Sequence, residues 1–410
     1  MRRAATPVLI LEMDHCGAVG AVRSLGRWGV PAYGVDGDAH APALVSRYSQ
    51  GGFVWDIATQ PRDASVEFLL ATAAQLGAPP ILLATTDAAA LFVAEHAAKL
   101  NAAFAFPDNP FELVRALYNK RDMERLACAA GVPTATSAFP QSRTDVVEFA
   151  QTAAFPVMLK AMDKIAVARR TKKRMRIIRS ADELLTYYDA MEDPANPTLM
   201  LQEYIPGRDE TVWMFDGYFD KQSRCLFGLT GRKIRQWPPY MGVTTLGVCV
   251  PNPTVEALTI QLVEATGYTG ILDIGYRYDT RDNTYKLLDV NPRLGATFRL
   301  FVGTGELDVV RAAYLHLTGQ AVPSSGIRDG RKWVVEMSDL ASSWRSYRDG
   351  ALTIRDWLRS YRRVQEGAWF ASDDPGPFLQ ICWRFFTRAL RQVVRRLSVR
   401  RTPEQGPVAT

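Results

Sequence analysis

Acidic and amide side chains gather between Asp273 and Arg293, and their types suit metal binding. Two apolar stretches within residues 271–290 are joined by a turn-rich connection, which predicts a hairpin with Asp273 on its first strand. On the second strand, Asp289 and Asn291 are two residues apart and therefore share a face. Two carboxylates and an amide oxygen on neighbouring strands form the oxygen set that Mg²⁺ prefers when it also binds phosphate. The residues alone also admit a simpler interpretation, in which Asp, Asn and Pro only end a strand.

Two lysines stand at the ends of predicted elements upstream of this hairpin. Lys120 opens a helix after Asn119, whose side chain suits the position before the first helical turn. Lys160 is the last residue of an apolar strand predicted over residues 155–160. Another predicted strand ends before Pro206 and Gly207, which form a hinge-like segment.

Taken in order, these landmarks resemble the ATP-grasp superfamily of carboxylate-activating ligases, in particular the D-aspartate ligase-like and carbamoyl-phosphate-synthetase-like subset. The sequence from Asp289 to Arg293 matches the family's acidic-x-Asn-Pro-Arg motif, with Asp where the family usually has Glu. By this resemblance, Asp273, Asp289 and Asn291 are the metal ligands. The resemblance also implies a nucleotide site made of Lys120, Lys160 and the hinge residues Gln202, Glu203, Tyr204 and Ile205, with either Asp209 or Glu210 at the ribose.

Further cations are candidates for binding anionic groups. Residues 231–242 are predicted to be a long connection, and by the same resemblance Lys233 and Arg235 in it contact the reacting anions, while Arg293 contacts the transferring phosphate. Arg299 either binds a substrate carboxylate or makes a structural salt bridge. A basic segment over residues 161–176 replaces a loop that is often glycine-rich in the family. Its lysines Lys172 and Lys173 either bind phosphate or are simply solvated.

The chemistry implied by the resemblance is ATP-dependent ligation of a carboxylate to an amine, with ATP and Mg²⁺ or Mn²⁺ as cofactors. Phosphorylation converts the carboxylate into an acyl phosphate, and a small-molecule amine then attacks it to give an amide, ADP and phosphate. Positioned cations and metal ions suit this reaction better than an acid-base dyad, because negative charge spreads over the transferred group. Two alternatives stay open: a nucleotide-binding scaffold without turnover, and a carboxylate-thiol ligase.

The elements that carry these residues alternate between strand and helix and predict an α/β protein. This order predicts a βαβ domain over residues 1–108 and a helical C-terminal extension. The resemblance implies that a two-lobed α+β grasp fold lies between them. The small lobe is predicted over residues 109–200, the large lobe with the metal site over 201–325, and the extension over 326–410.

Composition excludes several other classes of protein. The chain has 410 residues, 47% hydrophobic and 22% charged, which is typical of a globular protein. Residues 376–410 hold seven Arg and one acidic residue, which accounts for the whole net charge of +6. The rest of the chain is therefore neutral, and a general nucleic-acid-binding surface is not indicated. Five scattered cysteines without a CxxC pair favour a reducing cytoplasm. The pair His15-Cys16 favours a structural role over a nucleophilic one.

The C-terminal region has a pattern of its own. Residues 379–397 place apolar side chains at helical spacing beside a stripe of arginines, which predicts a basic amphipathic helix. Such a helix suits peripheral contact with an anionic membrane at the inner face or docking on a partner. It could equally pack on the protein body, and the sequence does not indicate an oligomeric state.

Overall fold

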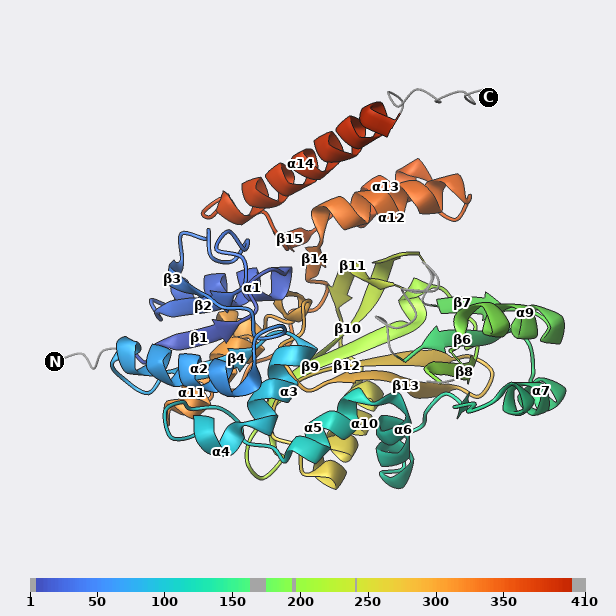
Figure 1. Ribbon diagram of the computed structural model, residues 1–410, viewed down its shortest axis with the longest axis horizontal. Coiled ribbons are helices and arrows are strands. Elements are labelled where there is room, and N and C mark those ends of the chain that lie inside the picture. Colours follow the sequence, from blue (N-terminus) through green and yellow to red (C-terminus); the bar gives the residue numbers. More distant parts are fainter. Residues whose placement is uncertain (1–4, 163–174, 194–196, 240–241, 400–410) are drawn as a thin grey trace, which may run out of the picture.

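The computed structural model describes residues 5–162, 175–193, 197–239 and 242–399, and within these ranges its strands form three sheets (Figure 1). The first sheet is parallel, in the order β3-β2-β1-β4, and matches the predicted βαβ arrangement. Its strands are β1 (Val8–Leu11), β2 (Ala32–Asp36), β3 (Ser49–Val54) and β4 (Ile81–Ala84). Its helices are α1 (Cys16–Gly26), α2 (Arg62–Leu76), α3 (Asp87–Glu95) and α4 (Ala97–Leu100).

Both faces of this first sheet are buried, as expected for parallel strands covered by helices. Val8 and Ile10 face one core together with α1, whereas Leu9 and Leu11 face the other with α2 and α3. The helix predicted after β4 is interrupted at His96, which separates α3 from α4.

The second sheet belongs to the small lobe and has the order β5-β8-β6-β7. Its strands are β5 (Ser137–Ala138), β6 (Val157–Ala161), β7 (Met175–Ile178) and β8 (Leu199–Glu203), and the helices α7 (Arg143–Thr152) and α9 (Ala181–Met191) pack in its core. Lys160 lies in β6 and Gln202 in the neighbouring β8, where Met158 and Gln202 pair across the two strands.

The third sheet has seven strands in the order β13-β12-β9-β10-β11-β14-β15 and forms the large lobe. Its strands are β9 (Val212–Phe219), β10 (Cys225–Trp237), β11 (Val243–Cys249), β12 (Gly270–Asp279), β13 (Thr284–Asn291), β14 (Lys332–Val334) and β15 (Val364–Gly367). The core on one face holds residues of α5 (Phe111–Tyr118), α6 (Lys120–Ala129) and α10 (Pro253–Thr266). The core on the other face holds residues of α1 and α11 (Val309–Leu317), so it is shared with the first sheet.

Three expectations about this part of the chain need correction. Most of the predicted connection over residues 231–242 is strand, because β10 continues to Trp237 and pairs with β11. The helices α5 and α6, predicted in the small lobe, pack in the large-lobe core. The predicted helical extension contains the strands β14 and β15, which continue the large-lobe sheet.

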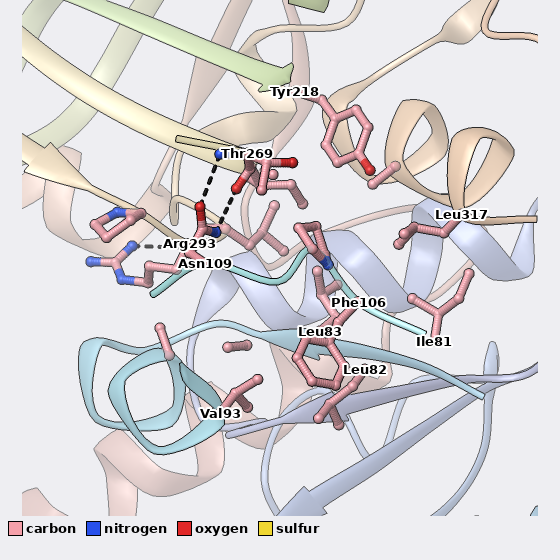
Figure 2. Close-up of a pocket in the computed structure, with 18 of the residues that line it drawn as sticks. Ile81, Leu82, Leu83, Val93, Phe106, Asn109, Tyr218, Thr269, Arg293 and Leu317 are labelled. Atoms are coloured by element: carbon pink, nitrogen blue, oxygen red, sulfur yellow. Dashed lines mark hydrogen bonds between the residues drawn. The ribbon is translucent and has the colours of Figure 1, made fainter. Parts of the chain in front are cut away.

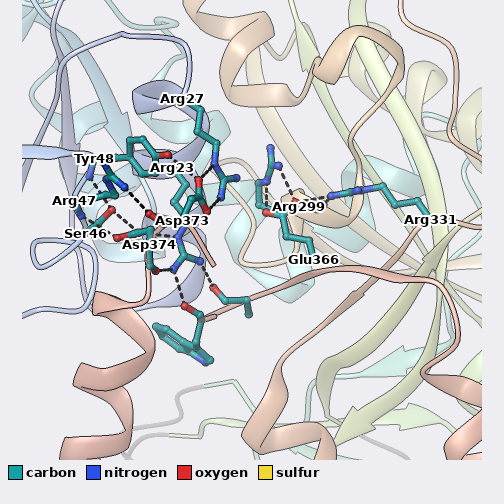
Figure 3. A network of polar contacts seen from close by, with 12 residues as sticks. Arg23, Arg27, Ser46, Arg47, Tyr48, Arg299, Arg331, Glu366, Asp373 and Asp374 are labelled. Atoms are coloured by element: carbon teal, nitrogen blue, oxygen red, sulfur yellow. Dashed lines mark hydrogen bonds and ion pairs between the residues drawn. The ribbon is translucent and has the colours of Figure 1, made fainter. Parts of the chain in front are cut away.

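The remaining extension consists of α12 (Glu336–Arg348), α13 (Ile354–Ser360) and α14 (Gly376–Val399). Buried ion pairs hold it to the rest of the chain (Figure 3). Asp374 accepts a hydrogen bond from Arg23 Nε at 2.9 Å, and both side chains are only 1% exposed. Asp374 also accepts from the Ser46 hydroxyl at 2.7 Å, so the segment before α14 is fixed to the first domain.

Candidate functional site

The predicted metal residues come together on the hairpin of β12 and β13. Asp273 lies directly opposite Asn291, and Asp289 lies opposite Gly275 two positions away. Asn291 Nδ2 donates a hydrogen bond to Asp289 at 3.2 Å. Burial raises the pKa of Asp273 to about 6; Asp289 adds to the rise, while Arg293 and Lys233 oppose it.

This donor set fits a divalent cation that also binds phosphate. The Asp273 carboxylate, whose pKa is raised, lies beside the Asp289 carboxylate, and a cation would neutralise the negative charge that the two concentrate. In the described part of the chain, no group of three or more His, Cys, Asp and Glu side chains is arranged to hold a metal. The predicted site therefore depends on the Asn291 oxygen and on oxygens of a ligand to complete the coordination.

Gly295, just after the motif, keeps the space beside Asp273 open. A Cβ atom at Gly295 would lie 2.5 Å from Asp273 Oδ2, closer than carbon and oxygen approach without displacement. Glycine is therefore required here for the Asp273 carboxylate to keep its position.

The two predicted nucleotide lysines approach the carboxylates from different elements. Lys120, the first residue of α6, pairs with Asp289 and donates to the Leu288 carbonyl at 3.2 Å, and Asn119 caps its helix as predicted. Lys160 in the small lobe donates to Gln202 Oε1. Burial lowers the pKa of Lys160 to about 8, Lys120 lowers it further, and Asp289 opposes the shift.

The hinge after β8 is tied to the large lobe through Glu203. Its carboxylate accepts hydrogen bonds from Lys286 at 2.9 Å, from Arg281 at 2.6 Å and from the Thr136 amide at 3.0 Å. Burial alone would raise the pKa of Glu203, but these donors hold it below its usual range. Of the next hinge residues, Ile205 is buried and Tyr204 lies beneath the Arg277 guanidinium.

The two acidic candidates for the ribose are placed differently. Asp209 accepts a hydrogen bond from Gln236 Nε2 at 2.8 Å, and burial raises its pKa. Lys233 lies close enough to Asp209 to oppose that rise. Glu210 is exposed, so Asp209 is the acid that faces the other candidate residues.

The two cations of β10 that were predicted to contact the reacting anions point to different sides of the strand. These residues are Lys233 and Arg235. Lys233 donates to the Gly242 carbonyl at 2.8 Å and to Gln236 at 3.2 Å; burial lowers its pKa to about 8, and the attraction of Asp209, Asp289 and Asp273 opposes that shift. Arg235 instead pairs with Asp339 of α12 at 2.7 Å, and the two side chains are 5% and 0% exposed.

The prediction that Arg235 contacts the reacting anions is therefore wrong. Irregular pairing of β10 with β11 around residues 233–236 lets Lys233 and Gln236 face Asp209, while Arg235 faces α12. Its charge is neutralised by a carboxylate 104 residues further along the chain.

The two remaining predicted arginines also have defined partners. Arg293 donates to Asn291 Oδ1 at 3.3 Å and to Asp87 at 2.6 Å, so it joins the metal motif to the start of α3 in the first domain. Arg299 is 4% exposed and pairs with Glu366 at 2.8 Å (Figure 3). It also pairs with Asp308. Of the two interpretations of Arg299, the structural salt bridge is confirmed.

Several residues near the site had no role in the sequence predictions. Arg277 on β12 lies near Lys160, Lys233 and Asp209, and burial lowers its pKa. Strand alternation could have indicated Arg277, because Arg277 stands four residues after Asp273 and therefore lies on the same face of the strand.

Asp216 is a second such residue, whereas His15 was expected to have a structural role. Asp216 on β9 lies directly opposite Asp273, is fully buried, and its oxygens accept no hydrogen bond from the described residues. His15 Nδ1 accepts from the Gly17 amide, and burial together with Arg293 lowers the His15 pKa to about 4. Burial raises the pKa of Cys16 to about 12, which argues against a nucleophilic pair.

An apolar cavity of about 90 Å³ lies between the first sheet and the large lobe (Figure 2). Ile81, Leu83 and Phe106 line it from one side and Tyr218 and Leu317 from the other, and Arg293 stands at its edge. Neither Asp273 nor Asp289 lines this cavity, so it is separate from the polar cluster. The predicted phosphate contacts Lys172 and Lys173 lie outside the described residues.

Comparison with known proteins agrees with this geometry. No model of a protein family matches the chain. A D-aspartate ligase of Enterococcus faecium (strain Aus0004) is 23% identical over 240 residues, which cover 56% of this chain and 57% of that protein. The chain thus matches just over half the length of this curated relative.

Solved structures resemble the chain over a larger share of its length. The biotin carboxylase domain of 2-oxoglutarate carboxylase from Hydrogenobacter thermophilus, in complex with MgADP, has a TM-score of 0.60 at 15% identity and covers 81% of this chain and 74% of that chain. Carboxyaminoimidazole ribonucleotide synthase from Aspergillus clavatus, complexed with ATP, has a TM-score of 0.59 at 15% identity, covering 79% and 80%. The chain has the ATP-grasp fold.

A third type of enzyme with a similar structure is an amino acid ligase. L-amino acid ligase from Bacillus licheniformis has a TM-score of 0.57 at 13% identity and covers 77% of this chain and 75% of that chain. The resemblance predicted from the sequence is confirmed, and the mixed α/β architecture with three sheets agrees with these structures.

Proposed function

We propose that this protein is an ATP-dependent carboxylate-amine ligase that takes an amino acid as one of its substrates. The observation that carries the proposal is the meeting of Asp273, Asp289 and Asn291 with the lysines Lys120, Lys160 and Lys233 from both lobes. The names of D-aspartate ligase and L-amino acid ligase support the substrate class.

In this proposal, the residues of the cluster divide into two sets. Asp273, Asp289 and Asn291 hold Mg²⁺, which would neutralise the charge of the nucleotide phosphates. Lys120 and Lys160 bind phosphate oxygens, and the segment from Gln202 to Ile205 binds the adenine with Asp209 at the ribose. The ATP supplies a phosphoryl group that turns the substrate carboxylate into an acyl phosphate.

Lys233 and Arg293 are proposed to act on the reacting groups. Lys233 is buried beside Asp273 and Asp289, so its ammonium lies where negative charge develops during phosphoryl transfer. Arg293 contacts Asn291 and Asp87, which places a guanidinium between the metal motif and the first domain. We propose that the second substrate binds on this side, near His15, because Arg293 is close enough to lower the His15 pKa.

The direct test is ADP release by purified protein with Mg²⁺, ATP and pairs drawn from a panel of amino acids, D-aspartate included, and small amines. We expect release that requires both substrates and an amide product detected by mass spectrometry. Asn291→Ala should abolish it, whereas Asn101→Ala, the same change at an exposed site of the first domain, should not. ATP binding without release for any pair would instead favour a scaffold without turnover. A thioester product in a parallel assay with a small thiol in place of the amine would favour a carboxylate-thiol ligase.

A further inference from the structure

The helix α12 exposes apolar side chains and buries polar ones, the reverse of an ordinary surface helix. The side of α12 that packs on β10 and β11 carries Asp339, Ser342 and Ser343, all fully buried. These side chains bond to polar partners: the Thr245 hydroxyl donates to Asp339 at 2.8 Å, and Ser342 donates to the Gln236 carbonyl at 2.7 Å. The opposite side of α12 is therefore left to face outward.

That outward side is strongly apolar. On α12, Leu340 is 50% exposed and Trp344 56%, and on α13 Ile354 is 55% and Leu358 67% exposed. Spacings of three or four residues place such side chains on one face of a helix. We call this set the α12–α13 patch; with the other exposed members of α12 it consists of Met337, Leu340, Trp344, Tyr347, Ile354 and Leu358.

The helix α14 carries a second exposed apolar stripe at the same end of the molecule (Figure 1). The stripe consists of Leu379, Trp383, Phe386 and Leu390, which are 62%, 60%, 60% and 51% exposed. Polar contacts fix the other side of α14, because Arg384 pairs with Asp14 and with Asp38, and Gln380 donates to the His40 carbonyl. The stripe is thus held outward from the first domain.

These two surfaces account for most of the exposed apolar side chains in the described ranges. Of the 17 large hydrophobic residues exposed there, 12 lie between Met337 and Leu390. An exposed apolar surface of this concentration marks an interaction site.

The charge around these surfaces is positive. The sequence of α14 contains five arginines and no acidic residue, and Arg388 and Arg391 are exposed. On α12 and α13, Arg348 and Arg355 are also exposed, whereas the exposed Arg345 and Arg359 pair with Asp349 and Asp356. Arg388 and Arg391 lie with Arg384 on the side of α14 that faces Asp14 and Asp38, opposite the stripe. A helix with an aromatic, apolar face and arginines on its other face suits an anionic lipid surface, where the rings enter the interface and the long arginine side chains reach toward the head groups.

We propose that the α14 stripe and the α12–α13 patch together dock this protein on an anionic lipid bilayer. A second copy of the chain fits less well, because pairing through the stripe would leave the arginines on the other side of α14 without a charged partner in the copy's α14, which has no acidic residue. In the described ranges, no helix is both long and apolar enough to cross a membrane, so the contact is peripheral. α14 lies in the plane of the interface.

Sedimentation of the full chain with lipid vesicles tests the proposal. We expect binding to vesicles of phosphatidylcholine mixed with phosphatidylglycerol, weak binding to phosphatidylcholine alone, and release by added salt. Arg388→Gln with Arg391→Gln should weaken binding about 25-fold, from roughly a fivefold factor per arginine near an anionic surface. Trp383→Ser with Phe386→Ser should weaken it at least about tenfold, through lost apolar burial.

Two further variants complete the design. Trp344→Ser with Leu358→Ser tests the α12–α13 patch and should also weaken binding, whereas Val54→Ser, at an exposed apolar residue of β3, should not. All these positions are exposed, and an unchanged melting temperature checks that each variant is folded. Equal binding to both vesicle types, or full binding by the Trp344 and Leu358 variant, overturns the proposal as stated.

Self-association is the competing outcome. If the chain ignores vesicles but forms a dimer that Trp383→Ser with Phe386→Ser dissolves in sedimentation velocity, the surfaces are an interface between copies and the membrane proposal is wrong. None of these substitutions touches the cluster around Asp273, so ligase activity and membrane binding can fail independently.

Discussion

Replacement of Arg235 by methionine should destabilise the protein without removing a catalytic group. Arg235 is the one predicted reactive-anion contact that the structure moves elsewhere, to Asp339 of α12. Methionine keeps much of the side-chain volume of arginine and removes only the charge and its donors. In the variant, Asp339 keeps hydrogen bonds from the Thr245 and Tyr361 hydroxyls at 2.8 Å and 2.6 Å.

The size of the effect follows from burial. The paired side chains are 5% and 0% exposed, so removal of the guanidinium leaves an uncompensated carboxylate with no access to solvent. Breaking a buried pair in this way costs about 3–5 kcal/mol in the free energy of unfolding. At a slope of about 2 kcal/mol per M urea, this lowers the unfolding midpoint by about 1.5–2.5 M.

The assay is urea unfolding followed by far-UV circular dichroism, together with ADP release measured where each variant is folded. We expect Arg235→Met to lose stability and keep kcat, and Arg359→Met, an exposed arginine of α13, to change neither. The double variant Arg235→Met with Asp339→Leu should recover part of the loss, because no unpaired charge remains but the Thr245 and Tyr361 hydroxyls lose their acceptor. A variant with normal stability and a large loss of kcat would refute this reasoning and return Arg235 to the reaction.

Three further predictions concern the cluster itself. Burial lowers the pKa of Lys160 to about 8, so the lysine loses its proton as pH rises through that value; the Kd for ATP, measured by calorimetry, should therefore rise above pH 8, and rise less in Lys160→Met. In Gly295→Ala the new Cβ would displace the Asp273 carboxylate, so the Mg²⁺ concentration for half-maximal ADP release should rise roughly tenfold or more; an unchanged value would mean that Asp273 does not bind the metal. Lys233→Met should lower kcat by about 10²-fold in steady-state assays while the melting temperature stays unchanged or rises, because a buried cation is removed; a normal kcat would contradict its role.

The metal hairpin could be predicted because its signals are local. Alternation along residues 271–290 and the turn between the two apolar stretches predict that these stretches pair as a hairpin. A shift of one residue in that pairing, between Gly275 and Tyr276, is what places Asp273 opposite Asn291. The start of α6 is equally local, since Asn119 accepts hydrogen bonds from the amides of Arg121 and Asp122. The hairpin and the start of α6 therefore needed only neighbours in the sequence, whereas the exact register of Asp273 did not.

The positions of isolated charges could not be predicted, because their partners are distant in the sequence. The basic residues within 231–242 looked like part of a loop, yet they lie in β10, where Asp339 neutralises Arg235. The irregular pairing of β10 and β11 that separates Arg235 from Lys233 has no local signal. Asp216, buried opposite Asp273, had none either.

The sequence by itself therefore determined the order of the elements, the βαβ start, the metal hairpin and the amphipathic character of α14, all of which depend on periodicity and turn chemistry over short segments. Only the tertiary structure decided which cations face the carboxylates, that Arg299 is a structural residue, and that α12 turns its polar side inward and its apolar side out. The physical reason is that burying a charge or an apolar face depends on its contacts, and those contacts come from segments that folding alone brings together.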